Sequence, residues 1–256
     1  MVPLRLLKRW PVWPNCAYTF MVSGLYFTLV YFFPIYFQAV RDSSAVESGI
    51  RNIPLILGVS LFTIVSTSLM ARTRQWMPLF VVGALLMVAG SALILNLGRA
   101  SPAKEWIGFQ ALVGIGVGIS MEIALVANQK NLPFDDIPAT IGLTMFFELA
   151  GGAVFVSAGE AIFANGLLAS LRRTAPSLDG AGALHYGALD IGEAFGAEAT
   201  HVVDSYMVGL RQTFTMVLVC ATVTAAIALM VVMYEYVLKI GDGRVLGREA
   251  SNEYRV

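Results

Sequence analysis

Three glutamates stand inside long apolar stretches of this sequence: Glu122, Glu148 and Glu160. An acid at the centre of a membrane helix costs roughly 3 kcal/mol of insertion free energy, whereas each strongly apolar residue contributes roughly 0.5 kcal/mol. The stretch around Glu148 and Glu160 holds about ten such apolar residues, or roughly 5 kcal/mol, which two ionised, lipid-facing acids would cancel. We therefore expect at least Glu148 to face protein or a watery cavity, to be protonated, or both.

Two kinds of role are open to these acids. An intramembrane carboxylate that titrates or binds a cationic substrate is a functional group, and we hold Glu148 and Glu122 as candidates for that role. The alternative is a structural glutamate that forms hydrogen bonds across helices. Glu160 lies close to a membrane surface, where an acid costs less.

Glycines accompany both candidate acids at helical spacing. Gly151 and Gly152 follow Glu148 by three and four residues, and Gly114 and Gly118 precede Glu122 in steps of four. Small residues let neighbouring helix backbones approach closely. These four glycines are therefore predicted to be helix-packing positions, and the acids are predicted to lie on or beside packing faces.

Other chemistry is poorly represented. The run from Gly114 to Gly118 places its third glycine one position too early for a dinucleotide loop and lies inside an apolar stretch. His185 and His201 stand 16 residues apart without cysteine companions, so we expect no metal site. We find no Ser/His/Asp or Cys/His arrangement and expect a protein that is not an enzyme.

The composition is that of a membrane protein. Of 256 residues, 57% are hydrophobic and only 13% are charged, against roughly 25% charged in soluble domains. The mean hydropathy is +0.71. Seventeen basic residues balance seventeen acidic ones, so the sequence offers no basic excess for binding nucleic acid. Cys16 and Cys220 both stand in apolar runs and are predicted to be small buried hydrophobes.

Six apolar runs approach the roughly 20 residues that a helix needs to cross a bilayer. We predict an all-α membrane protein with a lead of residues 1–14, a six-helix domain over 15–236 and a tail over 237–256. A long outer loop is expected over 166–211, with an interfacial helix near its end. The predicted spans are about 16–40, 53–71, 77–97, 106–127, 138–165 and 212–236.

Basic residues suggest an orientation. If the N-terminus is cytoplasmic, six spans return the C-terminus to the same side. The cytoplasmic segments then hold ten of the seventeen basic residues and the outer segments hold seven. Because basic residues are enriched in cytoplasmic loops, we predict that both termini are cytoplasmic.

Several segments resemble a known family. Residues 32–40 (FFPIYFQAV), 44–50 (SAVESGI) and 53–54 (IP) resemble the "LPIYFQ…SPxxSGxxxLP" signature of fungal multidrug transporters. These transporters form the fourteen-span drug:proton antiporter branch of the major facilitator superfamily. The similarity continues through residues 109–118, 132–138 and 146–157. It covers nearly the whole chain, but only as the last six spans of that family.

The resemblance implies a fold and an activity. The fold would be the C-terminal half of a major facilitator transporter, with an inverted three-plus-three repeat expected by analogy. The activity would be proton-coupled export of small organic compounds, such as drugs, toxins or fungal secondary metabolites, across the plasma membrane. No cofactor is expected beyond the proton gradient. By analogy, Tyr36 and Gln38 would line the cavity together with Glu122 and Glu148, unless the aromatic residues of the first span are interfacial.

The sequence also departs from the family. Glu122 and Glu148 stand where the family commonly has glutamine, which favours a substrate-specific acid over a shared proton carrier. The N-terminal half is absent, and the segment after Met1 resembles the family's linker. We therefore expect either a piece of a longer protein or a half-transporter that pairs with a second half. A truncated membrane protein that transports nothing is the alternative hypothesis.

Overall fold

Six long helices make up most of the chain. The structure, a computed structural model, describes residues 4–7, 10, 12–73, 75–129, 132–176, 178, 191 and 195–253, with α10 described as backbone alone beyond Val237. In that part of the chain all regular structure is helical, and six helical segments are long and apolar enough to cross a membrane. The long helices are α2 (Val12–Ile35), α4 (Ile53–Thr73), α5 (Met77–Ile94), α6 (Ala103–Gln129), α7 (Ile137–Thr174) and α10 (Ala199–Glu253).

Short elements join or extend these helices. They are α1 (Leu4–Leu7), the π-helical turn η1 (Tyr36–Val40), α3 (Ala45–Arg51), and the 3-10 turns η2 (Phe134–Asp136) and η3 (Gly196–Glu198). Ser44 caps α3 because its side chain accepts a hydrogen bond from the backbone of Glu47, at 3.2 Å. Pro78 lies in the first turn of α5, where the backbone N–H groups have no partner within the helix, so its missing N–H costs no helical hydrogen bond.

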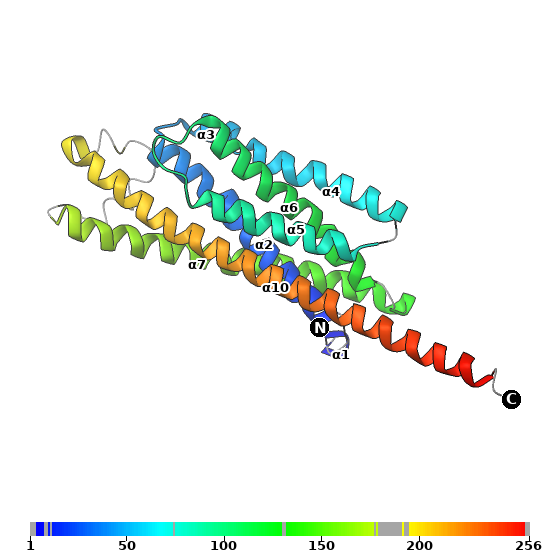
Figure 1. The fold of residues 1–256 in the computed structure, drawn as a ribbon. Coiled ribbons are helices and arrows are strands. Elements are labelled where there is room, and N and C mark those ends of the chain that lie inside the picture. Colours follow the sequence, from blue (N-terminus) through cyan, green and yellow to red (C-terminus); the bar gives the residue numbers. More distant parts are fainter. Residues whose placement is uncertain are drawn as a thin grey trace.

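Successive long helices run in opposite directions and define two ends of the bundle (Figure 1). We call one the Asp136 end, where Arg5 forms an ion pair with Asp136 at 2.6 Å. The other is the Arg99 end, where Arg99 of the α5–α6 connection pairs with Asp204 of α10 at 3.1 Å. α2 therefore starts at the Asp136 end, and α10 starts at the Arg99 end.

The core lies where α2 meets the other helices. α2 packs along α7, and both α4 and α5 pack against α6. α10 lies against α7, α5 and α2 (Figure 1). Large aromatic side chains of α2 and η1 fill the centre, where Phe33 and Phe37 are fully buried and Tyr18 stacks on Phe80 of α5 at 4.0 Å between ring centroids. Cys16 and Cys220 are free and buried.

Two helices keep much apolar surface uncovered. On α4, the side chains of Leu61 and Ile64 are 56% and 65% exposed, and on α7 Leu149 is 68% exposed. Such surface on helices of this length suits lipid or another protein rather than water. The chain is therefore a multi-pass membrane protein, with six membrane-spanning helices among the described residues.

The last two helices are longer than predicted. α7 continues to Thr174 and α10 begins at Ala199, so helix replaces the predicted loop at both ends of the range 166–211. The segment predicted as an interfacial helix is instead the first part of α10. Its apolar residues Val202, Tyr206 and Leu210 are buried in the bundle, so this segment packs on protein. His201 is exposed on this part of α10, and His185 lies outside the described residues.

Candidate substrate and proton site

Glu122 and Glu148 lie near each other although they belong to different helices. Glu122 is on α6 and Glu148 on α7; both side chains are partly buried, and the two carboxylates are close enough to interact electrostatically. Like charges repel most strongly where water is scarce. A proton or a cation placed between the two acids would relieve that repulsion.

The position of Glu122 is fixed by the contact of α6 with α4. A methyl group at Gly118 would lie 3.0 Å from the Cα of Val59 and 3.1 Å from the backbone nitrogen of Thr63. The Thr63 hydroxyl donates a hydrogen bond to the Gly118 carbonyl at 3.2 Å. Gly114 is equally tight, since a methyl group there would lie 3.2 Å from the Cα of Gly58. Glu122 follows one turn after this close approach.

The position of Glu148 is fixed by the contact of α7 with α2. The Ser23 hydroxyl of α2 donates a hydrogen bond to the backbone carbonyl of Glu148. A methyl group at Gly151 would meet the carbonyl oxygen of Phe20, and one at Gly152 would lie 3.1 Å from a ring carbon of Phe27. The glycines that follow Glu148 thus bring its backbone against α2.

Tyr36 and Gln38 lie elsewhere. The Tyr36 hydroxyl donates a hydrogen bond to the Gly98 carbonyl at 2.8 Å, and the Gln38 amide nitrogen donates one to the Ser48 hydroxyl at 2.8 Å. Both contacts are at the Arg99 end. Tyr36 stands 13 residues beyond Ser23 on α2 and η1, or about 20 Å along a helix axis at 1.5 Å per residue.

The structure therefore does not bring the four predicted site residues together. Glu122 and Glu148 form one pair. Tyr36 is fully buried, whereas Gln38 borders a separate pocket of about 210 Å³ that Asp42 and Arg99 also line. Glu160 is exposed on α7, 12 residues or about 18 Å along the helix from Glu148.

A buried polar cluster lies between the acid pair and the Asp136 end, and the sequence analysis missed it. Asn128 of α6 donates a hydrogen bond to the Thr144 hydroxyl of α7 at 2.8 Å. The Thr144 hydroxyl donates to the Thr140 carbonyl at 2.9 Å, and the Thr140 hydroxyl donates to the Asp136 carbonyl at 2.9 Å. Thr144 is 2% exposed, and Asn128 and Thr140 are fully buried.

This cluster has unused hydrogen-bonding capacity. The amide oxygen of Asn128 is buried and has no hydrogen-bond partner within the described part of the chain. Buried polar atoms are normally satisfied, so such a cluster is suited to hold water or to pass protons. One signal could have revealed it: Asp136, Thr140, Thr144 and Glu148 recur every four residues.

No group of three possible metal ligands is found among the described residues. The site consists of two acids on α6 and α7. The hydroxyl groups of Thr144 and Thr140 and the amide of Asn128 lie between these acids and the Asp136 end of the bundle. Such an arrangement can bind a cationic group or carry protons.

Comparison with known proteins identifies transporters. No protein-family model matches the chain. The efflux pump bfoC of Aspergillus brasiliensis is 36% identical over 214 residues, which are 83% of this chain and 38% of the pump. The MFS-type transporter thnB of Trichoderma harzianum is 37% identical over 84% of this chain and 37% of the transporter. A dehydrocurvularin exporter of Alternaria cinerariae is 33% identical over 86% of this chain and 38% of the exporter.

The chain spans about two fifths of the length of the curated relatives that it matches. The similarity nevertheless covers most of the chain and agrees with its six membrane-spanning helices. The chain therefore belongs to the fungal MFS-type transporters and efflux pumps of the major facilitator superfamily.

Proposed function

We propose that this chain forms the C-terminal half of a proton-coupled exporter of small organic compounds. The observation that carries the proposal is that Glu122 of α6 and Glu148 of α7 are partly buried and within electrostatic range of each other. The names of the relatives support export, because they include efflux pumps and an exporter of dehydrocurvularin.

In this proposal the acid pair binds either a cationic group of the substrate or a proton, and the two compete. Relief of repulsion between the carboxylates drives both events. Proton movement then resets the binding site. A membrane potential of 100 mV supplies about 2.3 kcal/mol per charge, enough for a concentration ratio of about fifty for a neutral solute.

The polar cluster supplies the route for the proton. Thr144 and Thr140 precede Glu148 on α7 by one and two helical turns, in the direction of Asp136. Asn128 of α6 donates a hydrogen bond to the Thr144 hydroxyl. We place the Asp136 end at the cytoplasm and both termini there, in the plasma membrane. A proton that enters from outside and reaches Glu148 would leave through this cluster.

The substrate path also needs a second half. Alternating access moves one six-helix half against another, with the substrate between them. The exposed apolar side chains of α4 and α7, such as Leu61 and Leu149, offer surface for that contact as well as for lipid. The partner is either the N-terminal half of a longer chain or a second half-transporter. Gln38 would then border the exit at the Arg99 end.

The test is transport by the full-length protein in a host that lacks its own pumps. Glu148→Gln and Glu122→Gln remove one charge each with little change in shape, and Glu160→Gln is the matched control on the same helix as Glu148. Accumulation of a cationic and a neutral compound is measured with the proton gradient present and with the gradient collapsed by a protonophore.

We expect the two site variants to lose gradient-dependent export or to change the ratio of cationic to neutral compound exported. The control should behave as the unaltered protein. Unchanged substrate range and gradient dependence in both site variants would remove the acid pair from the transport mechanism. Export that persists after collapse of the gradient would contradict proton coupling.

A further inference from the structure

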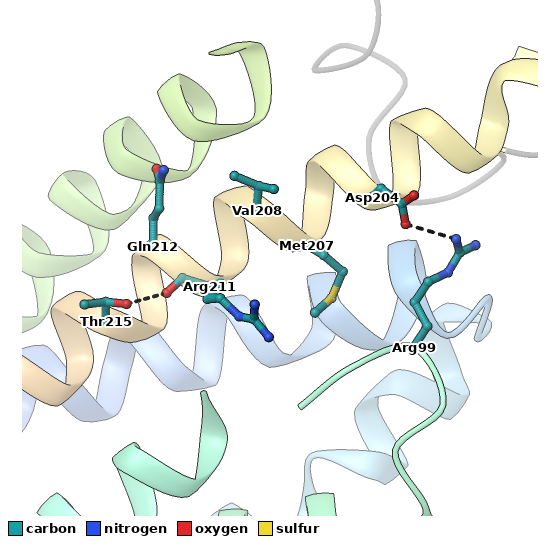
Figure 2. Close-up of a pocket in the computed structure, with 7 residues that line it drawn as sticks. All are labelled: Arg99, Asp204, Met207, Val208, Arg211, Gln212 and Thr215. Atoms are coloured by element: carbon teal, nitrogen blue, oxygen red, sulfur yellow. Dashed lines mark hydrogen bonds and ion pairs between the residues drawn. The ribbon is translucent and has the colours of Figure 1, made fainter. Parts of the chain in front are cut away.

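A pocket at the Arg99 end is separate from the acid pair. It has a volume of about 480 Å³ and lies between the first turns of α10 and the α5–α6 connection (Figure 2). Its charged border consists of Arg99, Asp204 and Arg211. Met207 and Val208 add apolar surface, and Gln212 adds an amide.

The charges of this pocket do not cancel. Arg99 pairs with Asp204 at 3.1 Å, and both side chains are about half exposed, at 45% and 57%. The guanidinium of Arg211 points to the same side of α10 as Met207 (Figure 2). It has neither an ion pair nor a hydrogen bond within the described part of the chain. The pocket therefore carries one net positive charge.

The depth of the pocket matches the polar border of a bilayer. Asp204 lies at the level of the α5–α6 connection, and Arg211 follows seven residues later, about 10 Å along the helix. The headgroup layer on each side of a bilayer is about 5–8 Å thick. Phe214, three residues after Arg211, packs on Phe33 inside the bundle, with 5.6 Å between ring centroids. Arg211 stands directly before the run 212–236, which the sequence predicts to span the membrane.

The surface below the pocket is apolar. Val208 at the pocket is 41% exposed, and the same face of α10 continues through Val219 and Val223, which are 56% and 38% exposed. A ligand that fills this surface needs an anionic group for Arg211 and a hydrocarbon part for the valines. A free phosphate ion would satisfy only the first of these needs.

We propose that this pocket binds a membrane phospholipid, with its phosphate on Arg211 and its acyl chains along Val219 and Val223. A guanidinium pairs well with phosphate because two N–H groups can donate in parallel to two oxygens. One phosphate charge would balance the net charge of the pocket.

The test is lipid binding by the full chain, purified in detergent and titrated with phosphatidylglycerol, with bound lipid counted by native mass spectrometry. Arg211→Gln removes the unpaired charge. Arg211→Lys retains the charge but lacks the planar guanidinium group, which can donate two parallel hydrogen bonds to a phosphate. Arg173→Gln removes an exposed arginine at the end of α7, outside the pocket, and is the matched control. Equal detergent-denaturation midpoints establish that the variants are folded.

We expect Arg211→Gln to weaken phosphatidylglycerol binding about tenfold, the loss of one charge-assisted contact. Arg211→Lys should bind with intermediate strength, and Arg173→Gln should bind as the unaltered chain does. Soluble glycerol phosphate carries the phosphate without acyl chains, so it distinguishes a lipid site from a site for soluble phosphate compounds. It should not compete at concentrations where the lipid saturates the site. Equal binding by Arg211→Gln would overturn the proposal, and effective competition by glycerol phosphate would overturn the assignment to a lipid.

Discussion

Replacing Gly114 by alanine should weaken the contact between α4 and α6. A Cβ at this position would meet the carbonyl oxygen of Leu55 and would lie 3.2 Å from the Cα of Gly58. Both neighbours are backbone atoms, so the clash cannot be relieved by turning a side chain. The helices must separate, and overpacking of this kind typically costs about 1–3 kcal/mol of stability.

Gly108 offers a matched control on the same helix. No atom lies within 4 Å of a Cβ built there, so Gly108→Ala changes helix propensity alone and should stabilise α6 by about 0.5–1 kcal/mol. Gly114→Ala gains the same propensity. The difference between the two variants therefore isolates the interhelical clash, and we expect it to be about 1–3 kcal/mol.

The assay is reversible unfolding in mixed micelles, followed by circular dichroism as a denaturing detergent is added. Gly114→Ala should unfold at a lower fraction of denaturing detergent than the unaltered chain or Gly108→Ala. If Gly114→Ala is at least as stable as Gly108→Ala, the close approach of α4 to α6 is refuted, and with it the placement of Glu122.

Three further substitutions test the contacts around the site by the same unfolding assay. Tyr36→Phe removes the hydrogen bond to the connection at the Arg99 end and should cost about 1 kcal/mol without altering gradient dependence of export; an unchanged midpoint would show that this bond adds no stability. Thr144→Val deprives the buried Asn128 amide of its acceptor and should cost about 1–3 kcal/mol, whereas a neutral effect would mean that the amide finds another partner. Arg5→Gln breaks the ion pair with Asp136, but the Arg5 side chain is 72% exposed, so the loss should stay below about 1 kcal/mol and vanish in high salt; a salt-independent loss would contradict a solvent-screened pair.

The number of membrane helices could be predicted because it depends on a property of single segments. Each predicted span overlaps one observed membrane-spanning segment, and the apolar length needed to cross a bilayer is fixed by its thickness. The ends of the last two helices could not be predicted in this way. The apolar spacing near the end of the predicted loop indicated a separate interfacial helix, but this segment is the first part of α10, where Tyr206 and Leu210 are buried by tertiary packing.

The site could be predicted only in part. The high free-energy cost of inserting an acid into a membrane identifies Glu122 and Glu148 as candidates from the sequence alone. Their mutual proximity depends on how α6 and α7 approach, which spacing within one helix does not reveal. The separation of Tyr36 from Glu148 and the burial of Asn128 are likewise properties of the packed bundle.

The central claim is that Glu122 and Glu148 are neighbours in one site that opens toward the transported compound. Cysteine cross-linking in membranes tests it most directly, with Glu122→Cys and Glu148→Cys combined in the full-length protein after Cys16 and Cys220 are replaced by serine. The control pair combines Glu122→Cys with Glu160→Cys. We predict that a short bifunctional thiol reagent joins the first pair, that it spares the control pair, and that a transported compound slows the reaction. Equal cross-linking of both pairs, or a reaction that no exported compound slows, would contradict the claim.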